Sequence, residues 1–186
     1  MLDHFGFLAP FYERVIPAPD VSRLTELLEL PVAGRLLDAG GGTGRVCSQL
    51  SHLVTDLVIT DASYGMLAQA KAKNDLALSQ SHAETLPFAD SSFERVLVVD
   101  ALHHFCDQRQ AIADLLRVLK NGGTLVIEEP DLNTFKVKLV AVAEKLALMR
   151  SHFYYPGEIK AMVEACGASA HIESDGDISA WVVVKK

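Results

Sequence analysis

The chain has 186 residues, of which 17 are Lys or Arg and 24 are Asp or Glu, so its net charge is −7 with the seven histidines neutral. A chain of this length favours a single domain and can bury roughly 70% of its unfolded surface, so it needs no disulfide or metal to fold. The acidic balance argues against nucleic acid as a partner, and no apolar run approaches the ~18 residues that a membrane span requires.

The cysteines and the first residues indicate a cytoplasmic protein. Cys47, Cys106 and Cys166 are odd in number and widely spaced, so they form neither a disulfide framework nor a zinc-binding pattern. The N-terminus reads Met-Leu-Asp-His and lacks the basic stretch and apolar core of a secretory signal. We therefore expect a protein of the reducing cytosol without a metal, in which Cys47 and Cys106 are small buried hydrophobic residues.

Strand and helix patterns alternate along the chain. Apolar and β-branched runs predict strands at residues 32–39, 55–60, 76–81, 93–99, 124–127, 168–173 and 178–184. Helix-forming segments lie between them, at residues 21–30, 43–51, 63–73, 108–119, 134–152 and 156–166. Asp20 and Ser63 are suitable N-caps, and Pro156 suits the first turn of its helix. Residues 121–123, Asn-Gly-Gly, are expected to end the helix before them.

Strands separated by helix-length connections favour an α/β fold with a parallel sheet and right-handed crossovers. The C-terminal third departs from strict alternation, because Asp175-Gly176 between two β-rich runs is a hairpin signal. The expected fold is a Rossmann-like, seven-stranded, mostly parallel sheet with helices on both faces and a C-terminal antiparallel hairpin strand. We expect one domain over residues 1–186, with an N-terminal helical lid at 1–30, a ligand-binding core at 31–132, and C-terminal helices and hairpin at 133–186.

The most informative segment, residues 38–44, reads Asp-Ala-Gly-Gly-Gly-Thr-Gly. A strand that runs into a glycine-rich turn and then a helix lets a ligand approach the backbone without Cβ atoms in the way. A plain tight turn is the alternative, although consecutive glycines cost folding entropy. The nicotinamide fingerprint G-x-G-x-x-G fits poorly, since its last position is Arg45 or Cys47, and no Gly-Lys-Ser/Thr of a phosphate-binding loop follows. The segment does match D-x-G-x-G-x-G.

Four further segments follow that loop in order. Asp61 lies 21 residues after Gly40, and residues 61–67 fit D-x-S-x-x-M-L. Residues 82–93 resemble D-A-E-x-L-P-F-x-D-x-S-F, residues 100–105 read Asp-Ala-Leu-His-His-Phe, and residues 116–123 resemble a stretch containing R-V-L-K-P-G-G. Together these segments resemble the class I S-adenosylmethionine-dependent methyltransferases. The chain is most similar to the small subgroup that includes the ubiquinone and menaquinone C-methyltransferases.

The resemblance implies S-adenosylmethionine as cofactor and S-adenosylhomocysteine as product. Asp38 and the glycine loop would hold the methionine end, Asp61 the ribose hydroxyls, and Met66 the adenine face. The full set of cofactor-binding residues implied by the resemblance is Asp38, Ala39, Gly40, Gly41, Gly42, Asp61, Ala62, Ser63, Met66, His82, Ala83, Glu84 and Asp100. Two positions depart from the family pattern: His82 stands where Asp is usual, and Asn121 stands where Pro is usual. A neutral imidazole can accept a hydrogen bond through one nitrogen, so cofactor affinity could become pH-dependent at His82.

Methyl transfer from a sulfonium is an in-line displacement that requires neither a metal nor a protein nucleophile. His103 follows the fourth core strand, where it could face the methyl group and act as general base. The alternative is that His103 and its neighbour are packing residues of a turn. Tyr12 is a second candidate on the substrate side, and it too could be a packing residue. The catalytic residues are therefore open at this point.

Two segments could cover the pocket and set the acceptor. Residues 2–16 carry several aromatic side chains that could form a lid. Residues 135–149 are apolar on more than one face, which fits a core helix, the wall of an apolar pocket or a homodimer contact. Both segments favour a small or lipophilic acceptor molecule over a polymer. The alternatives are an RNA or protein methyltransferase, a non-catalytic S-adenosylmethionine-binding protein and, at the level of the fold, a nucleotide-sugar or nicotinamide enzyme.

Overall fold

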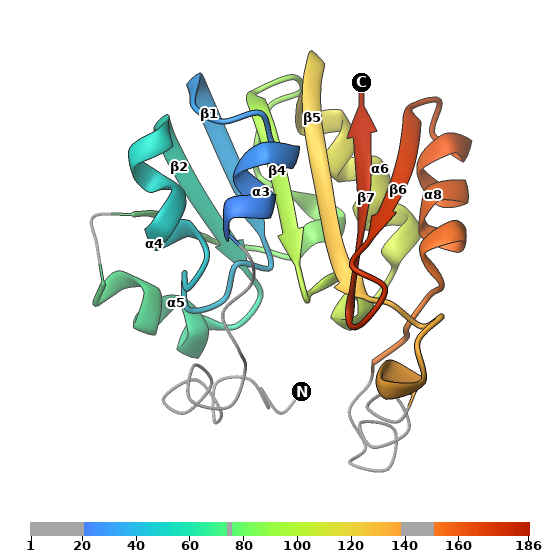
Figure 1. Ribbon diagram of the computed structural model, residues 1–186. Coiled ribbons are helices and arrows are strands. Elements are labelled where there is room, and N and C mark those ends of the chain that lie inside the picture. Colours follow the sequence, from blue (N-terminus) through green and yellow to red (C-terminus); the bar gives the residue numbers. More distant parts are fainter. Residues whose placement is uncertain (1–20, 74–75, 139–150) are drawn as a thin grey trace.

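The computed structural model describes residues 21–73, 76–138 and 151–186. Within these residues seven strands form one sheet, in the order β3-β2-β1-β4-β5-β7-β6 (Figure 1). In chain order the strands are β1 (Val32–Ala39), β2 (Val54–Asp61), β3 (Ala77–Gln80), β4 (Phe93–Val99), β5 (Leu119–Pro130), β6 (Ser169–Ser174) and β7 (Ser179–Lys185). Strands β1 to β5 pair in parallel, whereas β7 runs antiparallel to both of its neighbours, β5 and β6. The predicted fold class is confirmed, including the antiparallel hairpin at the end of the chain.

Helices lie on both faces of this sheet (Figure 1). Among the described residues the α-helices with assigned bounds are α3 (Val21–Leu27), α4 (Cys47–Leu50), α5 (Tyr64–Lys71), α6 (Gln108–Val118) and α8 (Pro156–Ala165), and the short 3-10 helices are η1 (Ser51–Leu53), η2 (Ala83–Thr85) and η3 (Leu102–His104). Buried residues of α6 and α8 belong to one hydrophobic cluster, and those of α3, α4 and α5 belong to another. No helix in the described ranges has the length and apolar character that a membrane crossing needs.

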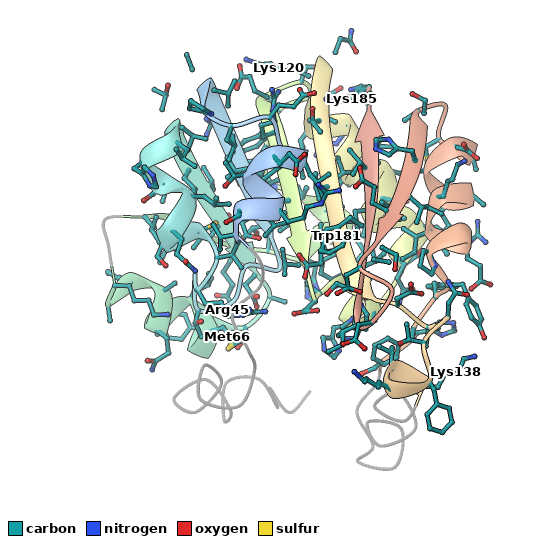
Figure 2. The ribbon with its side chains drawn as sticks, in the orientation of Figure 1. Arg45, Met66, Lys120, Lys138, Trp181 and Lys185 are labelled. Atoms are coloured by element: carbon teal, nitrogen blue, oxygen red, sulfur yellow. The ribbon has the colours of Figure 1, made fainter. Side chains whose placement is uncertain are left out.

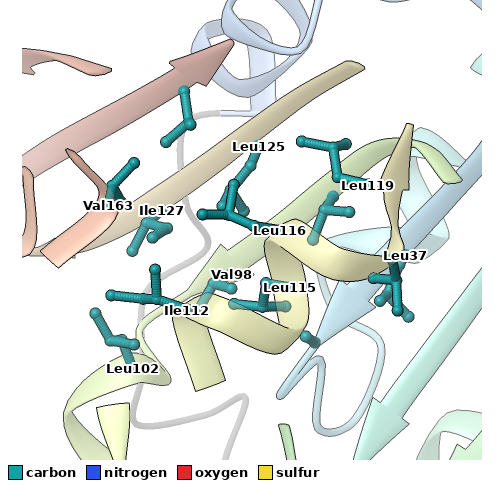
Figure 3. Packing of buried hydrophobic residues seen from close by; sticks show 14 of the residues in the cluster. Leu37, Val98, Leu102, Ile112, Leu115, Leu116, Leu119, Leu125, Ile127 and Val163 are labelled. Atoms are coloured by element: carbon teal, nitrogen blue, oxygen red, sulfur yellow. The ribbon is translucent and has the colours of Figure 1, made fainter. Parts of the chain in front are cut away.

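The central strands are buried on both faces, and consecutive residues point into different clusters. In β4, Val96 and Val98 contribute to the cluster under α6, whereas Leu97 and Val99 contribute to the cluster under α4 and α5. Figure 3 shows the first cluster, in which Val98 of β4 lies beside Ile112 and Leu115 of α6. Side chains alternate across a strand, so a strand buried on both faces must be apolar at every position. The apolar run that follows Arg95 therefore predicted this strand correctly.

Helices α5, α6 and α8 begin at or within one residue of their predicted starts, and side chains cap the first turns of α5 and α6. Ser63 is the N-cap of α5 and its hydroxyl accepts a hydrogen bond from Met66 N at 3.3 Å. Asp107 caps α6 by accepting from Gln110 N at 3.0 Å. Pro156 occupies the first position of α8, where a backbone N–H would make no hydrogen bond within the helix, so proline costs nothing there. Capping side chains satisfy backbone donors that the first helical turn leaves unpaired.

The structure corrects several predicted boundaries, among them the start of α4 and the segment that follows α6. Helix α4 begins at Cys47 instead of residue 43, because the preceding backbone forms a turn in which Gly44 N donates to Gly41 O at 2.9 Å. Helix α6 ends at Val118, before the Asn-Gly-Gly segment, because Leu119 is already extended, fully buried and paired with Phe93 of β4. The glycines instead lie within β5, at the point where its pairing with β4 shifts register.

The predicted helix over 134–152 falls largely outside the described residues. Residues 135–138 are helical, which agrees with its start, and residues 139–150 are not described. Residues 151 and 152 are not helical, so the predicted end is wrong. His152 N instead donates to the carbonyl oxygen of His103 at 2.7 Å, which holds this segment against η3. Residues 1–20, with the predicted aromatic lid, Tyr12 and the Asp20 cap, also lie outside the described part of the chain.

The exposure of the cysteines differs in part from expectation. Cys47 is fully buried, as expected, but Cys106 and Cys166 are exposed. Cys106 lies two residues after η3, in the short connection to α6, where it is exposed. The expectation that Cys106 is a buried hydrophobic residue is therefore wrong.

Candidate active site

The order of the strands reverses between β1 and β4, because the chain runs outward through β2 and β3 and then returns to the other side of β1. In open α/β sheets, ligands bind outside the carboxyl ends of the strands at such a switch point. The glycine loop, residues 40–44, lies there, directly after β1. Gly40 N and Gly41 N both donate to Thr60 O, at 2.8 and 3.2 Å, so the loop is fastened to the end of β2.

Asp61, at the end of β2, connects the glycine loop to α5. Its Oδ2 accepts from Gly42 N at 3.0 Å, and its Oδ1 accepts from Ser63 N at 2.8 Å. A Cβ added to Gly42 would stand 3.0 Å from Cε of Met66, which projects from the first turn of α5. The missing side chain at Gly42 therefore keeps open the space between the loop and Met66.

Asp38 is buried beneath the same loop, with 1% of its surface exposed. Its Oδ2 accepts a hydrogen bond from Sγ of Cys47 at 2.8 Å, whereas its Oδ1 has no partner among the described residues. Burial raises the pKa of Asp38 to about 6, and the hydrogen bond from Cys47 opposes that rise. An acceptor oxygen buried without a donor is costly, so it marks a place where a ligand donor would be favourable.

Asp100 directly follows β4 and carries a backbone φ of +50°. Its Oδ2 lies 2.9 Å from Nη2 of Arg45, which comes from the segment that leads into α4. Burial raises the pKa of Asp100, as does the nearby charge of Glu129, while Arg45 opposes both effects. Non-glycine residues in the left-handed region are strained, and such residues concentrate at functional sites.

These elements enclose one pocket at the carboxyl end of the sheet. The residues that line it are Asp38, Gly40, Gly41, Gly42, Thr43, Arg45, Val46, Met66 and Val99. Five of the predicted cofactor-binding residues are in this set, namely Asp38, the three glycines and Met66. Asp61, Ser63 and Asp100 do not line the pocket, but each is bonded to residues of the loops around it.

The remaining predicted residues lie beside the pocket or farther away. Ala39 is the buried last residue of β1, and Ala62 is exposed after β2. His82 is exposed and Ala83 is buried, at the start of η2. Glu84 Oε1 accepts from the backbone N–H of Asp107 at 3.0 Å, so in this structure it supports the connection to α6.

His103 is 4% exposed and lies in η3, after β4. Its Nδ1 is 2.6 Å from Oε2 of Glu129, and its ring stacks on Phe153 with the centroids 4.3 Å apart. Glu129 Oε1 also accepts from the backbone N–H groups of Ala101 and Leu102, at 3.0 and 2.8 Å. The Glu129 carboxylate therefore holds the loop after β4 together with the imidazole of His103.

Sequence reasoning missed three charged residues of this region: Arg45, Glu128 and Glu129. Glu128 is buried at the end of β5, where its carboxylate accepts from Trp181 Nε1 at 2.9 Å and Ser179 Oγ at 3.3 Å. Burial raises the pKa of Glu128 to about 7. The available signal was two acidic residues at the end of an apolar strand pattern, which is where parallel strands carry functional groups.

The chain is similar to methyltransferases in both sequence and structure. Residues 37–127 match the family described as "Methyltransferase domain". An uncharacterized methyltransferase YcgJ of Bacillus subtilis is 32% identical over 62% of this chain and 51% of its own length. A demethylmenaquinone methyltransferase of Renibacterium salmoninarum is 37% identical over 54% of this chain and 43% of its own length. The chain thus spans about half the length of these curated relatives.

The solved structure of YcgJ from Bacillus subtilis superposes with a TM-score of 0.75 and 20% identity, over 89% of this chain and 97% of that one. The family match covers the glycine loop, Asp61 and Asp100, and it ends within β5. Its span therefore includes the elements whose carboxyl ends build the pocket. Residues 37–127 of this chain are thus similar to a methyltransferase domain over the elements that build the pocket.

Proposed function

We propose that this chain transfers a methyl group from S-adenosylmethionine to a small, lipophilic acceptor molecule. The observation that carries the proposal is the pocket at the switch point, which combines a backbone cradle at Gly42 with a buried carboxylate oxygen of Asp38 that has no partner among the described residues. These features fit the family's cofactor, because its methionine end carries an ammonium donor and must pass close to the loop backbone. When bound, the sulfonium of that cofactor supplies the methyl group to an acceptor by in-line displacement.

The residues present would divide the cofactor between them. Asp38 and the glycine loop would bind the methionine end, and Asp61 would accept hydrogen bonds from the ribose hydroxyls. Met66 would pack on the adenine, with Ala62 and Ala83 at its border. His82 would take the place of the usual carboxylate at the adenine amino group. Residues 31–132 would thus hold the cofactor within a single domain.

Asp100 would contribute negative charge near the cofactor's cationic end. Its carboxylate lies at the carboxyl end of β4 and pairs with pocket-lining Arg45. The proposal requires no protein base, because alignment of the acceptor with the methyl group supplies most of the catalytic effect. The burial of His103 and its contact with Glu129 support a loop-ordering role for that residue.

The acceptor class is supported by charge and by the relatives. Asp38 and Arg45 are the charged residues among those that line the pocket, so the described part of the site does not offer the basic surface that RNA requires. One relative carries the name demethylmenaquinone methyltransferase, which denotes a small lipophilic acceptor. A lipophilic hydroquinone or phenol is therefore the first acceptor class to test.

The test is a methyl-transfer assay that measures S-adenosylhomocysteine formation by the whole chain. Lipophilic hydroquinones and phenols form one panel, and bulk RNA and a protein extract form two others. The proposal predicts product with the small-molecule panel, and loss of that product in Asp61→Ala. Product with RNA or protein alone would favour the polymer alternative. Cofactor binding without product in any panel would favour a non-catalytic S-adenosylmethionine-binding protein.

A further inference from the structure

We propose that Arg45 binds the α-carboxylate of the cofactor's methionine end and leaves Asp100 in order to do so. The inference rests on the proposed function and assigns to it a residue outside the motifs that predicted the site. It follows from two groups of opposite charge that face one pocket: the guanidinium of Arg45 and the carboxylate of Asp38. An amino-acid end carries an ammonium and a carboxylate, so a pocket with one anion and one cation is complementary to it.

The Arg45 side chain is placed to reach a bound ligand. It comes from the segment just after the glycine loop, and 11% of the side chain is exposed. Arg45 and Met66 both line the pocket, and Figure 2 shows them together at one end of the sheet, away from Lys120 and Lys185 at the other. A guanidinium that is mostly withdrawn from water favours a strong, bidentate partner, and a carboxylate is the partner that matches its geometry.

Arg45 contacts Asp100 in this structure, and a ligand carboxylate could replace Asp100 as its partner. The Asp100 side chain keeps 31% of its surface exposed, so water can solvate its carboxylate when Arg45 leaves it. Nη2 of Arg45 lies 2.9 Å from Oδ2 of Asp100. A ligand carboxylate enclosed in the pocket would be less screened and could accept two N–H groups. Exchange of partners would then free the carboxylate of Asp100 to face the cofactor's positive charge.

The experiment compares S-adenosylmethionine with decarboxylated S-adenosylmethionine, which keeps the sulfonium and the amine but lacks the carboxylate. Affinities for the whole chain are measured by isothermal titration calorimetry. We expect the wild type to prefer the intact cofactor by about 10- to 100-fold, the range of a charge-assisted hydrogen bond. Arg45→Gln should reduce that preference to near one, and Arg45→Lys should restore part of it.

The matched control is Arg35→Gln. Arg35 is also paired with an aspartate, Asp56, at 2.8 Å, but it lies in β1 before the glycine loop and does not line the pocket. Its substitution should leave the preference for the carboxylate unchanged. Asp100→Asn should also keep the full preference, because it removes the competing partner of Arg45, and asparagine tolerates the φ of +50° at this position.

Each outcome bears on one of the two proposals. If the wild type binds neither ligand, the proposed function fails. If the wild type binds the intact cofactor and Arg45→Gln keeps the full preference for it, the role of Arg45 fails while the proposed function stands. The role also fails if Asp100→Asn abolishes the preference. If Arg45→Gln does not fold, as judged by unfolding without ligand, then Arg45→Lys and Asp100→Asn decide.

Discussion

Several carboxyl groups at the carboxyl end of the sheet have a raised pKa, and burial is the leading cause in each. The pKa of Asp38 is raised to about 6 and that of Glu128 to about 7, and the pKa of Asp100 is raised as well. Shifted groups of this kind gather at functional sites, because a binding site must hold charge in a place that water reaches poorly. The folded state therefore binds protons at these residues more tightly than the unfolded state does.

Glu128 gives a test of this effect through pH. Its pKa rises from the usual 4.5 to about 7 on folding, so the folded state holds the extra proton between these values and stability falls as the pH rises through them. The free energy of unfolding of the wild type, measured relative to Glu128→Gln, should therefore fall by roughly 1–3 kcal/mol between pH 4.5 and 7. Urea unfolding at a series of pH values measures this difference. A difference that stays flat, or that rises with pH, would contradict the assignment. Glu164→Gln, on the exposed side of α8, is the control.

Gly42 tests the backbone cradle. Gly42 and Gly122 both have a positive φ, of +54° and +77°, but a Cβ on Gly42 would approach Met66 whereas a Cβ on Gly122 would meet nothing within 4 Å. Alanine at either position should lower stability by about 1–2 kcal/mol, because both force an L-residue into the left-handed region. Only Gly42→Ala should weaken the binding of S-adenosylhomocysteine, by at least about tenfold, or ~1.4 kcal/mol. Equal affinities of the two variants in calorimetry would refute the cradle.

The part of the site that depends on short local motifs could be predicted from the sequence. Asp38, the glycines and Met66 belong to short patterns, and they line the pocket together. Arg45 and Glu129 have no such signal, because their importance arises from contacts with residues far away in the chain. Arg45 contacts Asp100, and Glu129 contacts the loop that begins at Ala101. Only the pairing of β4 with β5 and of β1 with β4 brings those groups together.

At the level of the elements, the strands and the long helices could be predicted because their patterns agree with their burial. Helix α6 has its apolar residues on one face, and strand β4 is apolar on both. The boundaries that sequence reasoning missed are decided by competition between neighbouring elements. Leu119 could extend α6 by periodicity, but pairing with Phe93 buries it completely in β5. The local sequence pattern does not show whether Leu119 belongs to α6 or to β5.

Helix α6 also allows a test of how the core holds the sheet. Leu115 is fully buried in the cluster between α6 and the sheet, as Figure 3 shows. Leu115→Ala should lower the free energy of unfolding by about 2–5 kcal/mol, since it removes buried methyl groups and leaves a cavity. Arg109→Ala, at an exposed position of the same helix, should change it by about 0.5 kcal/mol or less. Urea unfolding measures both, and a loss below about 1 kcal/mol for Leu115→Ala would contradict the packing.

At the scale of the whole molecule, the two ends of the sheet carry different side chains. Figure 2 places Arg45 and Met66 at one end, with Lys120 and Lys185 at the other. Strands β1, β2 and β4 are parallel, so their carboxyl ends lie at the same end of the sheet. Asp38, Asp61 and Asp100 stand at or directly after these strand ends and therefore lie at the first end. The buried clusters on the two faces fix these strands, so the carboxylates around the pocket are held by the core of the molecule.

The central claim is that this end of the sheet binds S-adenosylmethionine, and thermal unfolding tests it most directly. S-adenosylmethionine and S-adenosylhomocysteine, each at about 100 times its Kd, should add ~2.7 kcal/mol and raise Tm by roughly 5–10 °C, whereas NAD should not. The shift should vanish in Asp61→Ala and persist in Asp56→Ala, which changes a carboxylate at the opposite end of β2. A shift with NAD alone, or no shift with either adenosyl ligand, would contradict the account.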